Sequence, residues 1–406
     1  MAIPPEFPRA NLPAPAALHV PSVMEPEAAV LPLLDESAEP EADPALLDAT
    51  GVGLWAVVFA GGIGSRFWPL STARRPKPVL ALVNERPLIA DTVHRLAPLV
   101  PPERVLVVTS ADIVETLHAA IPEVPRANLL IEPRPLGTAA ALAWGATAVA
   151  QRAGAETPFC AVHADLSVGR PDALRQTLRQ AVAEAMRTEA LVAIGVRPTR
   201  CETGFGYLQP GTPLDGLRTI ADGAAHRVSY MVEKPTAALA DTLIERGAFW
   251  NSGMYVWRAS VVLNALSAHT REVAHALPLL AAGALSQFAA EVTSVSIERG
   301  LLERSDAVVV LPGDFEWDDV GTWAALRRIR ELDDTGNGLM GDVHCVDASG
   351  NVIHADGQCI VAYGISGMLV VSLDGLTFVT TLERATDLGP LLNALPGSVR
   401  FSPGRS

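Results

Sequence analysis

The chain has 406 residues, which is enough for two or three structural units, and it is rich in apolar residues but poor in aromatic ones. Its formal net charge of −14 is concentrated at the start, because residues 1–50 hold nine acidic residues and one basic residue and so contribute −8. The rest of the chain contributes −6 and has no basic stripe suited to nucleic acid. The sequence has no run of about 18 apolar residues, the length that a membrane span needs.

The first segment, residues 1–52, has the composition of a disordered acidic leader. Its first 50 residues hold ten prolines among many alanines and glutamates, without a helical or strand period. It lacks the basic start and apolar block of a secretory signal, and it is too acidic for a transit peptide. We therefore predict a soluble, cytoplasmic protein whose ordered part begins near residue 53.

Between residues 54 and 196, short apolar runs alternate with segments of helical period. The runs are LWAVVFA (54–60), RVLVVTS (104–110), NLLIEP (128–133), FCAVHAD (159–165) and LVAIGV (191–196). This alternation predicts an α/β fold with a doubly wound, mostly parallel sheet and helices on both faces. Ligands of such sheets bind at the carboxyl ends of the strands, which places the loop 61–77 and Asp165 at one edge. We expect the less regular segment 203–257 to be an insert that carries substrate loops.

From about residue 341 the chain changes to short β-rich runs separated by Gly, Asp, Asn and Ser. The runs recur roughly every eight or nine residues without helices between them. They predict a small β-helix-like unit over residues 341–396, closed by a helix at about 383–395. The preceding unit then spans residues 53–340.

The four cysteines show no paired metal-binding spacing; they are Cys160, Cys201, Cys345 and Cys359. Three of them lie in or beside apolar runs, where a buried free thiol is the usual outcome. We therefore expect buried free thiols at those three positions.

The stretch FAGGIGSRFWPLSTARRPKPVL (59–80) places Gly61, Gly62 and Gly64 directly after the first apolar run. It lacks the third glycine of a dinucleotide fingerprint and the Gly-Lys-Ser/Thr of a P-loop. It keeps two separated cations, Arg66 and Lys77, which with backbone N–H donors suit a long polyphosphate. The alternative is a tight turn that carries two surface cations.

This loop, from Gly61 to Ser71 with Pro76-Lys77 following, resembles the signature of sugar-1-phosphate nucleotidyltransferases. Four later motifs stand in the order and spacing of the mannose-1-phosphate guanylyltransferase branch: TGFGYL (203–208), VEKP (232–235), WNSGMYVW (250–257) and DFEWDDVGTW (314–323). The resemblance covers about residues 54–395. It implies a Rossmann-like nucleotidyltransferase core in the catalytic domain, residues 53–340, and transfer of GMP from GTP to α-D-mannose 1-phosphate, which gives GDP-mannose and pyrophosphate. Dimerisation is a further trait that it implies.

The implied reaction needs charge neutralisation more than a general base, because a hexose 1-phosphate with a second pKa near ~6 is already an anion. The resemblance assigns Mg²⁺ to two carboxylates, Asp165 and Asp319. For each aspartate the alternative role is a helix N-cap. Local sequence does not distinguish Asp319 from its neighbour Asp318.

The resemblance divides the other site residues between two substrates. Arg66 and Lys77 would contact the triphosphate as the catalytic cations. The nucleotide would be bound by Gly61, Gly62, Gly64, Glu132, Gly137 and Thr138, and the sugar phosphate by Gly206, Glu233, Lys234 and Asn251. The alternatives are an exposed ion-pairing turn at Glu233-Lys234 and a simple turn at Asn251.

The chain departs from the family pattern at several positions. It has His163-Ala164-Asp165-Leu166 where Pro-Ala-Asp-His is usual, Gly137 in place of Asn, Pro78 in place of Gln, and Glu298 in place of Asp. His163 either replaces the missing histidine or is a buried, hydrogen-bonded structural residue. These departures leave open a different base or sugar phosphate, such as uridylyl or thymidylyl transfer or a heptose phosphate. A non-catalytic regulator that binds a nucleotide sugar is the third alternative.

Overall fold

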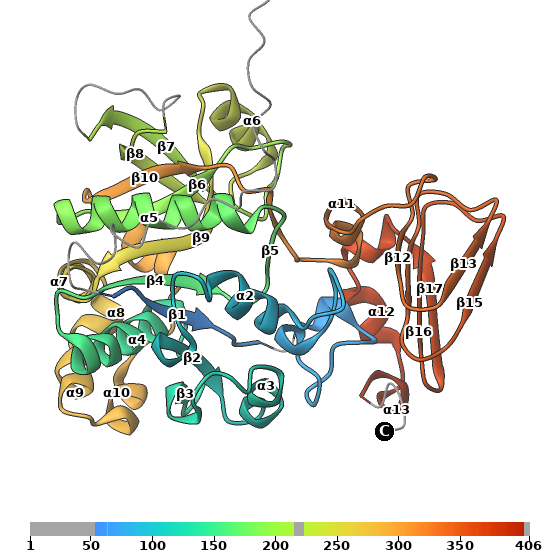
Figure 1. Cartoon of the computed structure of the whole chain (residues 1–406), viewed down its shortest axis with the longest axis horizontal. Helices are drawn as coiled ribbons and strands as arrows, with labels where there is room; N and C mark the ends of the chain where they lie inside the picture. The colour runs from blue at the N-terminus through green and yellow to red at the C-terminus, as the bar shows by residue number, and fades with distance from the viewer. Residues whose placement is uncertain (1–52, 63, 215–222, 402–406) are drawn as a thin grey trace, which may run out of the picture. The chain divides into compact units, whose positions relative to one another are not determined.

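The computed structural model describes residues 53–62, 64–214 and 223–401 (Figure 1). The predicted leader, residues 1–52, lies outside the described residues. None of the helices within these described ranges combines the length and the apolar character that a membrane crossing needs.

Nine strands form the central sheet in the order β3-β2-β1-β4-β9-β6-β10-β8-β7 (Figure 1). Their bounds are β1 Trp55–Phe59, β2 Val105–Ser110, β3 Leu129–Glu132, β4 Pro158–His163, β6 Leu191–Val196, β7 Gly206–Pro213, β8 His226–Glu233, β9 Phe249–Arg258 and β10 Val308–Gly313. Strands β8 and β9 pair antiparallel with their neighbours, so they run opposite to the other strands. The five predicted apolar runs form β1, β2, β3, β4 and β6.

The segment 203–257 is not the irregular insert that we expected. It supplies β7, β8 and β9, and β9 lies inside the sheet between β4 and β6. Its glycines and asparagine hide the strand pattern, and a register irregularity occurs between Ala193 and Gly195 of β6 where β9 pairs with it. The motifs of this segment are therefore part of the central sheet.

Helices cover both faces of the sheet, as the alternation predicts. Val58 of β1 belongs to one apolar core, and its neighbours Val57 and Phe59 belong to the other, because successive strand side chains point to opposite faces. The first core includes residues of α2 Leu88–Leu96, α3 Val114–Ala120, α5 Pro171–Arg187 and α6 Ala237–Glu245. The second includes residues of α4 Thr138–Ala153, α7 Ala259–His269, α8 Arg271–Ala274, α9 Leu277–Ala281 and α10 Leu285–Glu291.

A second, two-stranded sheet pairs β5, Leu166–Val168, with β11, Trp317–Asp319. The pairing is antiparallel, and Leu166 lies opposite Asp319. It joins the chain directly after β4 to a segment about 150 residues later. Sequence periodicity did not predict these strands, because each has only three residues.

The C-terminal part consists of short strands that stack mainly in parallel. Their bounds are β12 Gly338–Met340, β13 Val343–Val346, β14 Val352–Ala355, β15 Ile360–Tyr363, β16 Met368–Leu373 and β17 Leu376–Thr381. They form the sheets β12-β14-β16-β17 and β13-β15, in which only the β16–β17 pair is antiparallel among the described strands. Buried Asn351 joins successive turns, since its amide donates to Ile365 O and its Oδ1 accepts from Met368 N.

The predicted closing helix at 383–395 is interrupted. Residues Arg384–Thr386 form one 3₁₀ turn, and the α-helices are α12 Gly389–Ala394 and α13 Gly397–Arg400. Asp387 has an extended backbone, and Pro390 follows at the start of α12, so the helix begins anew there. The short α11, Leu326–Ile329, lies just before the β-rich part.

A third apolar core joins the β-rich part to the glycine loop. It contains Phe67 and Trp68 from the loop, Trp323, and Leu369 from β16. The Trp323 indole donates to Trp68 O at 3.0 Å. Packing in this third core thus holds the residues after the glycines in place. The glycines themselves, Gly61, Gly62 and Gly64, are exposed or half-buried.

Arg330 is buried at this junction without a carboxylate among its hydrogen-bond partners in the described chain. Its guanidinium donates to Leu82 O at 2.8 Å and to His354 Nδ1 at 3.0 Å. Burial lowers the pKa of Arg330 to about 9. Burial first, and then the charge of Arg330, lowers the pKa of His354 to about 3.

We expect His354 to make the protein less stable as the pH falls below about 6.5. The unfolded chain binds a proton at His354 near ~6.5, whereas the folded chain keeps it neutral, so the free energy of unfolding falls by about 1.4 kcal/mol per pH unit between these two pKa values. His354→Asn keeps an acceptor for Arg330 but does not titrate. Chemical denaturation at pH 7.0 and 5.5 should show a loss smaller by roughly 1 kcal/mol in this variant. Exposed His275→Asn is the control, and equal losses in both variants would contradict the prediction.

Candidate functional site

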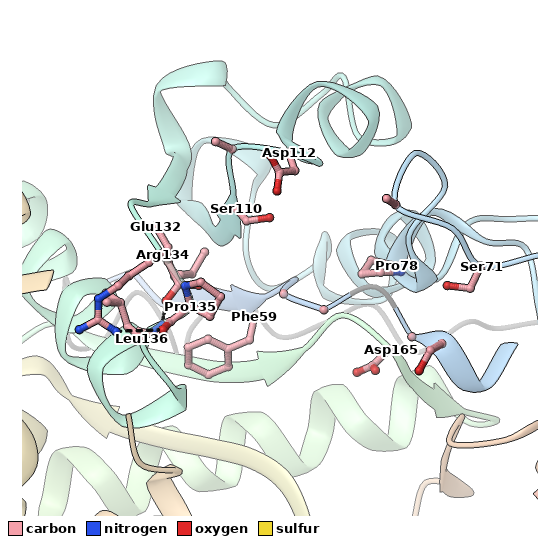
Figure 2. A pocket seen from close by; sticks show the side chains of 18 of the residues that line it. Phe59, Ser71, Pro78, Ser110, Asp112, Glu132, Arg134, Pro135, Leu136 and Asp165 are labelled. Atoms are coloured by element: carbon pink, nitrogen blue, oxygen red, sulfur yellow. Dashed lines mark hydrogen bonds between the residues drawn. The ribbon is translucent and has the colours of Figure 1, made fainter. Parts of the chain in front are cut away.

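A cavity of about 1100 Å³ opens at the carboxyl ends of the parallel strands. Its wall includes the last residue of each of four strands: Phe59, Ser110, Glu132 and His163. In the view of Figure 2, Phe59 lies between Glu132 and Asp165. The position is the one expected for ligands of such sheets, and the volume is ample for a nucleoside triphosphate.

The glycine loop and the start of α4 supply much of the cavity wall. All six residues predicted for the nucleotide line it: Gly61, Gly62, Gly64, Glu132, Gly137 and Thr138. Burial raises the pKa of Glu132, against the effect of a hydrogen bond from Leu136 N. The glycine loop, the end of β3 and the start of α4 therefore line one concave surface, to which Glu132 of β3 adds a carboxyl.

Gly137 is required by the local packing at the start of α4. Its φ of +85° is unfavourable for other residues, and a Cβ there would lie 2.6 Å from Ser294 Oγ and 2.8 Å from Val295 N. Thr138 Oγ1 accepts from Ile297 N at 2.9 Å. The segment 294–297 thus packs directly against this part of the cavity wall and leaves no space for a side chain.

Lys77 and Arg66 lie in different environments, and neither belongs to the cavity wall. Lys77 is buried, and its Nζ lies 2.6 Å from Asp165 Oδ2. A Cβ on Gly64 would lie only 2.4 Å from Lys77 Cβ, so the loop packs tightly on this lysine. Arg66 is exposed. The alternative of two surface cations is therefore wrong for Lys77.

The β5–β11 sheet brings two aspartates together. Asp165 immediately precedes β5, whose first residue, Leu166, pairs with Asp319 of β11. Asp319 interacts electrostatically with Lys77 and Arg66 as well as with Asp165. The two predicted carboxylates and the two predicted cations thus form one cluster at the edge of the sheet.

The N-cap alternative is wrong for both aspartates. Asp165 precedes a strand, and Thr322, not Asp319, caps the following 3₁₀ turn by accepting from Ala325 N. The structure also separates Asp319 from Asp318, whose carboxylate forms ion pairs with Arg200 at 2.9 Å and Arg328 at 3.1 Å. Within the described ranges the Asp319 carboxylate has no such partner.

Electrostatics set the two aspartates apart. Burial alone would raise the pKa of Asp165, but Lys77 and His163 oppose it and hold this pKa below its ordinary value. Burial raises the pKa of Asp319, and the charge of Asp165 adds to that effect while Lys77 and Arg66 counteract it. A further cation near both carboxylates would favour their ionised forms.

The residues predicted for the sugar form a second cluster, outside the cavity wall. Gly206 pairs with Glu233 across β7 and β8, and a Cβ on Gly206 would lie 2.6 Å from Glu233 Oε2 and 3.3 Å from Asn251 Cβ. The absent side chain therefore leaves room for the Glu233 carboxylate. Asn251 is buried within β9, so the turn alternative is wrong for it.

Lys234 lies in an exposed position next to this cluster. Its Nζ donates to Glu233 Oε1 at 2.8 Å, its side chain is 58% exposed, and its φ is +53°. The ion-pair alternative thus describes Lys234, whereas the Glu233 side chain is only 10% exposed. Burial, partly offset by Lys234, raises the pKa of Glu233.

Tyr255 and Glu298 complete this cluster and were not predicted. Asn251 Nδ2 donates to Tyr255 Oη at 2.9 Å, and that hydroxyl donates to Glu298 Oε1 at 3.1 Å. Tyr255 follows Asn251 by four residues on β9, so strand period was a usable signal for it. Glu298 begins the short π-helix Glu298–Leu302; the sequence marked it as a departure from the family pattern but gave no sign that it lies beside Asn251.

A family model described as nucleotidyl transferase matches residues 55–335, which is more than half of the chain. The chain belongs to the nucleotidyl transferase family.

Individual relatives of this nucleotidyl transferase cover most of its length. A mannose-1-phosphate guanylyltransferase of Sinorhizobium fredii is 30% identical over 350 residues, 83% of this chain and 67% of the relative. The alginate biosynthesis protein AlgA of Pseudomonas putida is 31% identical over 354 residues, 84% of this chain and 71% of the relative. A solved structure from Thermus thermophilus, described as a mannose-1-phosphate geranyltransferase, is 35% identical with a TM-score of 0.75 and covers 84% of this chain and 98% of its own.

Two residues that depart from the family pattern, Leu166 and His163, lie in different environments in this nucleotidyl transferase. Leu166 is buried in an apolar core, and its carbonyl accepts from Arg95 Nη1 at 2.9 Å. The His163 ring lines the cavity 5.4 Å from the ring of Phe59 and forms no hydrogen bond within the described residues. A Cβ on Gly253 of β9 would lie 3.2 Å from His163 Cδ2, so His163 touches the strand that carries Asn251.

Proposed function

We propose that this nucleotidyl transferase is a mannose-1-phosphate guanylyltransferase, which transfers GMP from GTP to α-D-mannose 1-phosphate and releases pyrophosphate. Relatives with that name span more than four fifths of the chain at about 30% identity. The geometric observation that carries the proposal is the meeting of the glycine loop, Lys77, Asp165 and Asp319 at the carboxyl edge of the sheet. This arrangement suits a polyanionic nucleotide beside a cation-binding pair of carboxylates.

On the nucleotide side, we assign binding of the base and ribose to the cavity. Gly61, Gly62 and Gly64 present backbone N–H groups, and Glu132 is available to hydroxyl or amine donors of the nucleotide. Gly137 and Thr138 border the same space. Arg66 and Lys77 are the catalytic cations in this proposal, and they balance the charge of the triphosphate.

A divalent cation, Mg²⁺ in this proposal, fits the donor set of Asp165 and Asp319. Both offer carboxylate oxygens, which hard cations prefer, and the β5–β11 register holds them close together. When bound, the cation would neutralise phosphate charge at the reacting centre. The 2.6 Å contact with Lys77 keeps Asp165 ionised and fixes its orientation, so its carboxylate can bind the cation.

On the sugar side, the Glu233 carboxylate would accept hydrogen bonds from sugar hydroxyls, and the Asn251 amide would accept or donate them. Gly206 has no side chain and so leaves space for Glu233 and Asn251. Tyr255 orients Asn251 through its hydroxyl. Lys234 would reach the phosphate of the sugar after release from Glu233. The phosphate oxygen then attacks the α-phosphorus of GTP without a protein base, since it is already ionised near neutral pH.

The finer organisation is part of the same proposal. Residues 53–340 would be the catalytic domain, and 341–396 would be the β-helix-like domain; β12, which pairs with β14, favours a boundary a few residues earlier. We also propose a cytoplasmic enzyme that acts as a homodimer, without nucleic acid or membrane as a partner. Sedimentation or light scattering of the purified chain tests the dimer.

The test of the function is pyrophosphate release with Mg²⁺, crossing GTP, UTP, dTTP, ATP and CTP with mannose, glucose and heptose 1-phosphates. We expect release with GTP and mannose 1-phosphate only. Gly137, part of a Leu-Gly-Thr-Ala stretch, favours the second candidate, a nucleotidyl transferase that uses another base. Release with UTP or dTTP but not GTP would support that candidate. No release with any pair, together with binding of a nucleotide sugar, would support a regulator.

A further inference from the structure

Three side chains with metal-binding atoms meet on the solvent face of the small β13–β15 sheet. They are Asp342, His344 and Cys359, all exposed, and their ligand atoms all lie within 4.8 Å of one another. None of them belongs to the cavity wall. Cys359 was expected to be buried beside its apolar run, but it lies directly before β15 on the exposed side of the sheet.

The strand register explains why they meet. Val343 pairs with Ile360 in parallel, so Asp342 and Cys359, which directly precede these two strands, lie side by side. Ile360 N donates to Asp342 O at 2.9 Å, which fixes the two strand starts. His344 follows Asp342 by two residues and therefore projects from the same face. The ladder thus holds the three side chains together, although 15 residues separate His344 from Cys359 in the sequence.

The spacing of the donor atoms suits a tetrahedral zinc ion. Two nitrogen or oxygen ligands, each about 2.0–2.1 Å from zinc at the tetrahedral angle, lie about 3.3 Å apart. His344 Nε2 and Asp342 Oδ1 are 3.3 Å apart in the protein. The Cys359 thiol lies beside the same Asp342 carboxylate, with its sulfur within 4.8 Å of the other two donor atoms, and its bond to zinc is longer, about 2.3 Å.

The chemistry of the donors points to the same ion. Thiolate, imidazole and carboxylate together are a zinc-type set, whereas Mg²⁺ avoids thiolate. No lysine or arginine in the described ranges forms an ion pair with Asp342, whose partner is His344. We propose that Asp342, His344 and Cys359 bind Zn²⁺ on the C-terminal sheet, with water in the remaining coordination position.

Cobalt(II) is the probe, because a thiolate bound to Co²⁺ gives a near-ultraviolet charge-transfer band that oxygen-only sites do not. The full chain, reduced and stripped of metal by a chelator, should develop this band with one equivalent of Co²⁺ and lose it when Zn²⁺ is added. Cys359→Ser should abolish the band and weaken Zn²⁺ binding by at least about 100-fold. His344→Gln should weaken Zn²⁺ binding to a similar extent.

Cys201→Ser is the matched control, because Cys201 is also exposed but lies outside this cluster. It should keep both the band and the Zn²⁺ affinity of the parent chain. Absence of the band from the parent, or its persistence in Cys359→Ser, would overturn the proposal. Equal Zn²⁺ affinity of the parent and Cys359→Ser would overturn it as well. Pyrophosphate release by Cys359→Ser should match the parent, so the outcome is independent of the proposed transferase function.

Discussion

Replacing Asp165 with asparagine is expected to lower kcat for nucleotidyl transfer by about 1000-fold. The substitution keeps the size of the side chain but removes the charge that faces Lys77 Nζ at 2.6 Å. It also removes one of the two carboxylates that we propose as cation ligands. Steady-state pyrophosphate release at saturating nucleotide and sugar phosphate measures the change, and circular dichroism establishes that the variant is folded.

The matched control for this prediction is Asp318→Asn. Asp318 lies beside Asp319, yet its carboxylate is already engaged by Arg200 and Arg328. We therefore expect Asp318→Asn to retain most of the parent's kcat, and Asp319→Asn to behave like Asp165→Asn. If Asp165→Asn turned over at the parent's rate, the proposed cation site would be wrong.

Stability separates the structural role of Asp165 from its catalytic role. Asp165→Asn leaves the buried Lys77 cation without its carboxylate, which should cost about 1–2 kcal/mol, less than for a fully buried pair because the Asp165 side chain is 31% exposed. Adding Lys77→Met removes the buried cation that lost this carboxylate and should restore much of the free energy of unfolding in urea. It should not restore kcat.

The first half of the fold followed from local sequence pattern. Runs such as 54–60 and 104–110 are continuous apolar segments because strands inside this sheet are buried on both faces. The helices between them keep the period of a face packed on the sheet, as α5 does. The cavity position also followed, because it depends only on the carboxyl ends of these strands.

Pairings between distant segments could not be read from the sequence. Leu166 and Asp319 meet across strands of three residues, which are too short to show a period. Asp319, not Asp318, is available to bind a cation because Arg200 and Arg328 pair with Asp318. The sequence around residues 318–319 gives no sign of these two arginines. The exposure of Cys359 likewise depends on which face of β15 meets solvent, and its neighbouring apolar run suggested the opposite.

The sugar cluster lies between these two cases. Glu233 and Asn251 were identified by resemblance alone, and their neighbourhood arises from the β7–β8 and β7–β9 pairings. Tyr255 could have been predicted from the strand period, because it follows Asn251 by four residues on β9 and therefore lies on the same face. Glu298 follows Ile297, whose N–H donates to Thr138 Oγ1, so one short segment touches both the sugar cluster and the cavity wall.

Gly64→Ala is expected to lower kcat by about 100-fold through a displacement of Lys77. The new Cβ would lie 2.4 Å from Lys77 Cβ, far below contact distance, and Lys77 Cβ is attached directly to the backbone and cannot rotate away. The loop or the lysine must therefore move, and Lys77 Nζ would leave its position beside Asp165. A misplacement of about 1 Å at a catalytic group has this order of effect.

The control for Gly64→Ala must carry the same backbone strain without the contact. Gly247 has a φ of +77°, close to the +73° of Gly64, and a Cβ there would meet no atom within 4 Å. Backbone strain should cost each alanine variant about 1 kcal/mol of unfolding free energy, because an L-residue is disfavoured in this region. Gly64→Ala should lose more than Gly247→Ala, because the contact with Lys77 adds to the strain. Only Gly64→Ala should lose kcat. Equal kcat in the two variants would mean that the placement of Lys77 by the glycine loop does not limit turnover, because the strain is common to both and the contact with Lys77 is not.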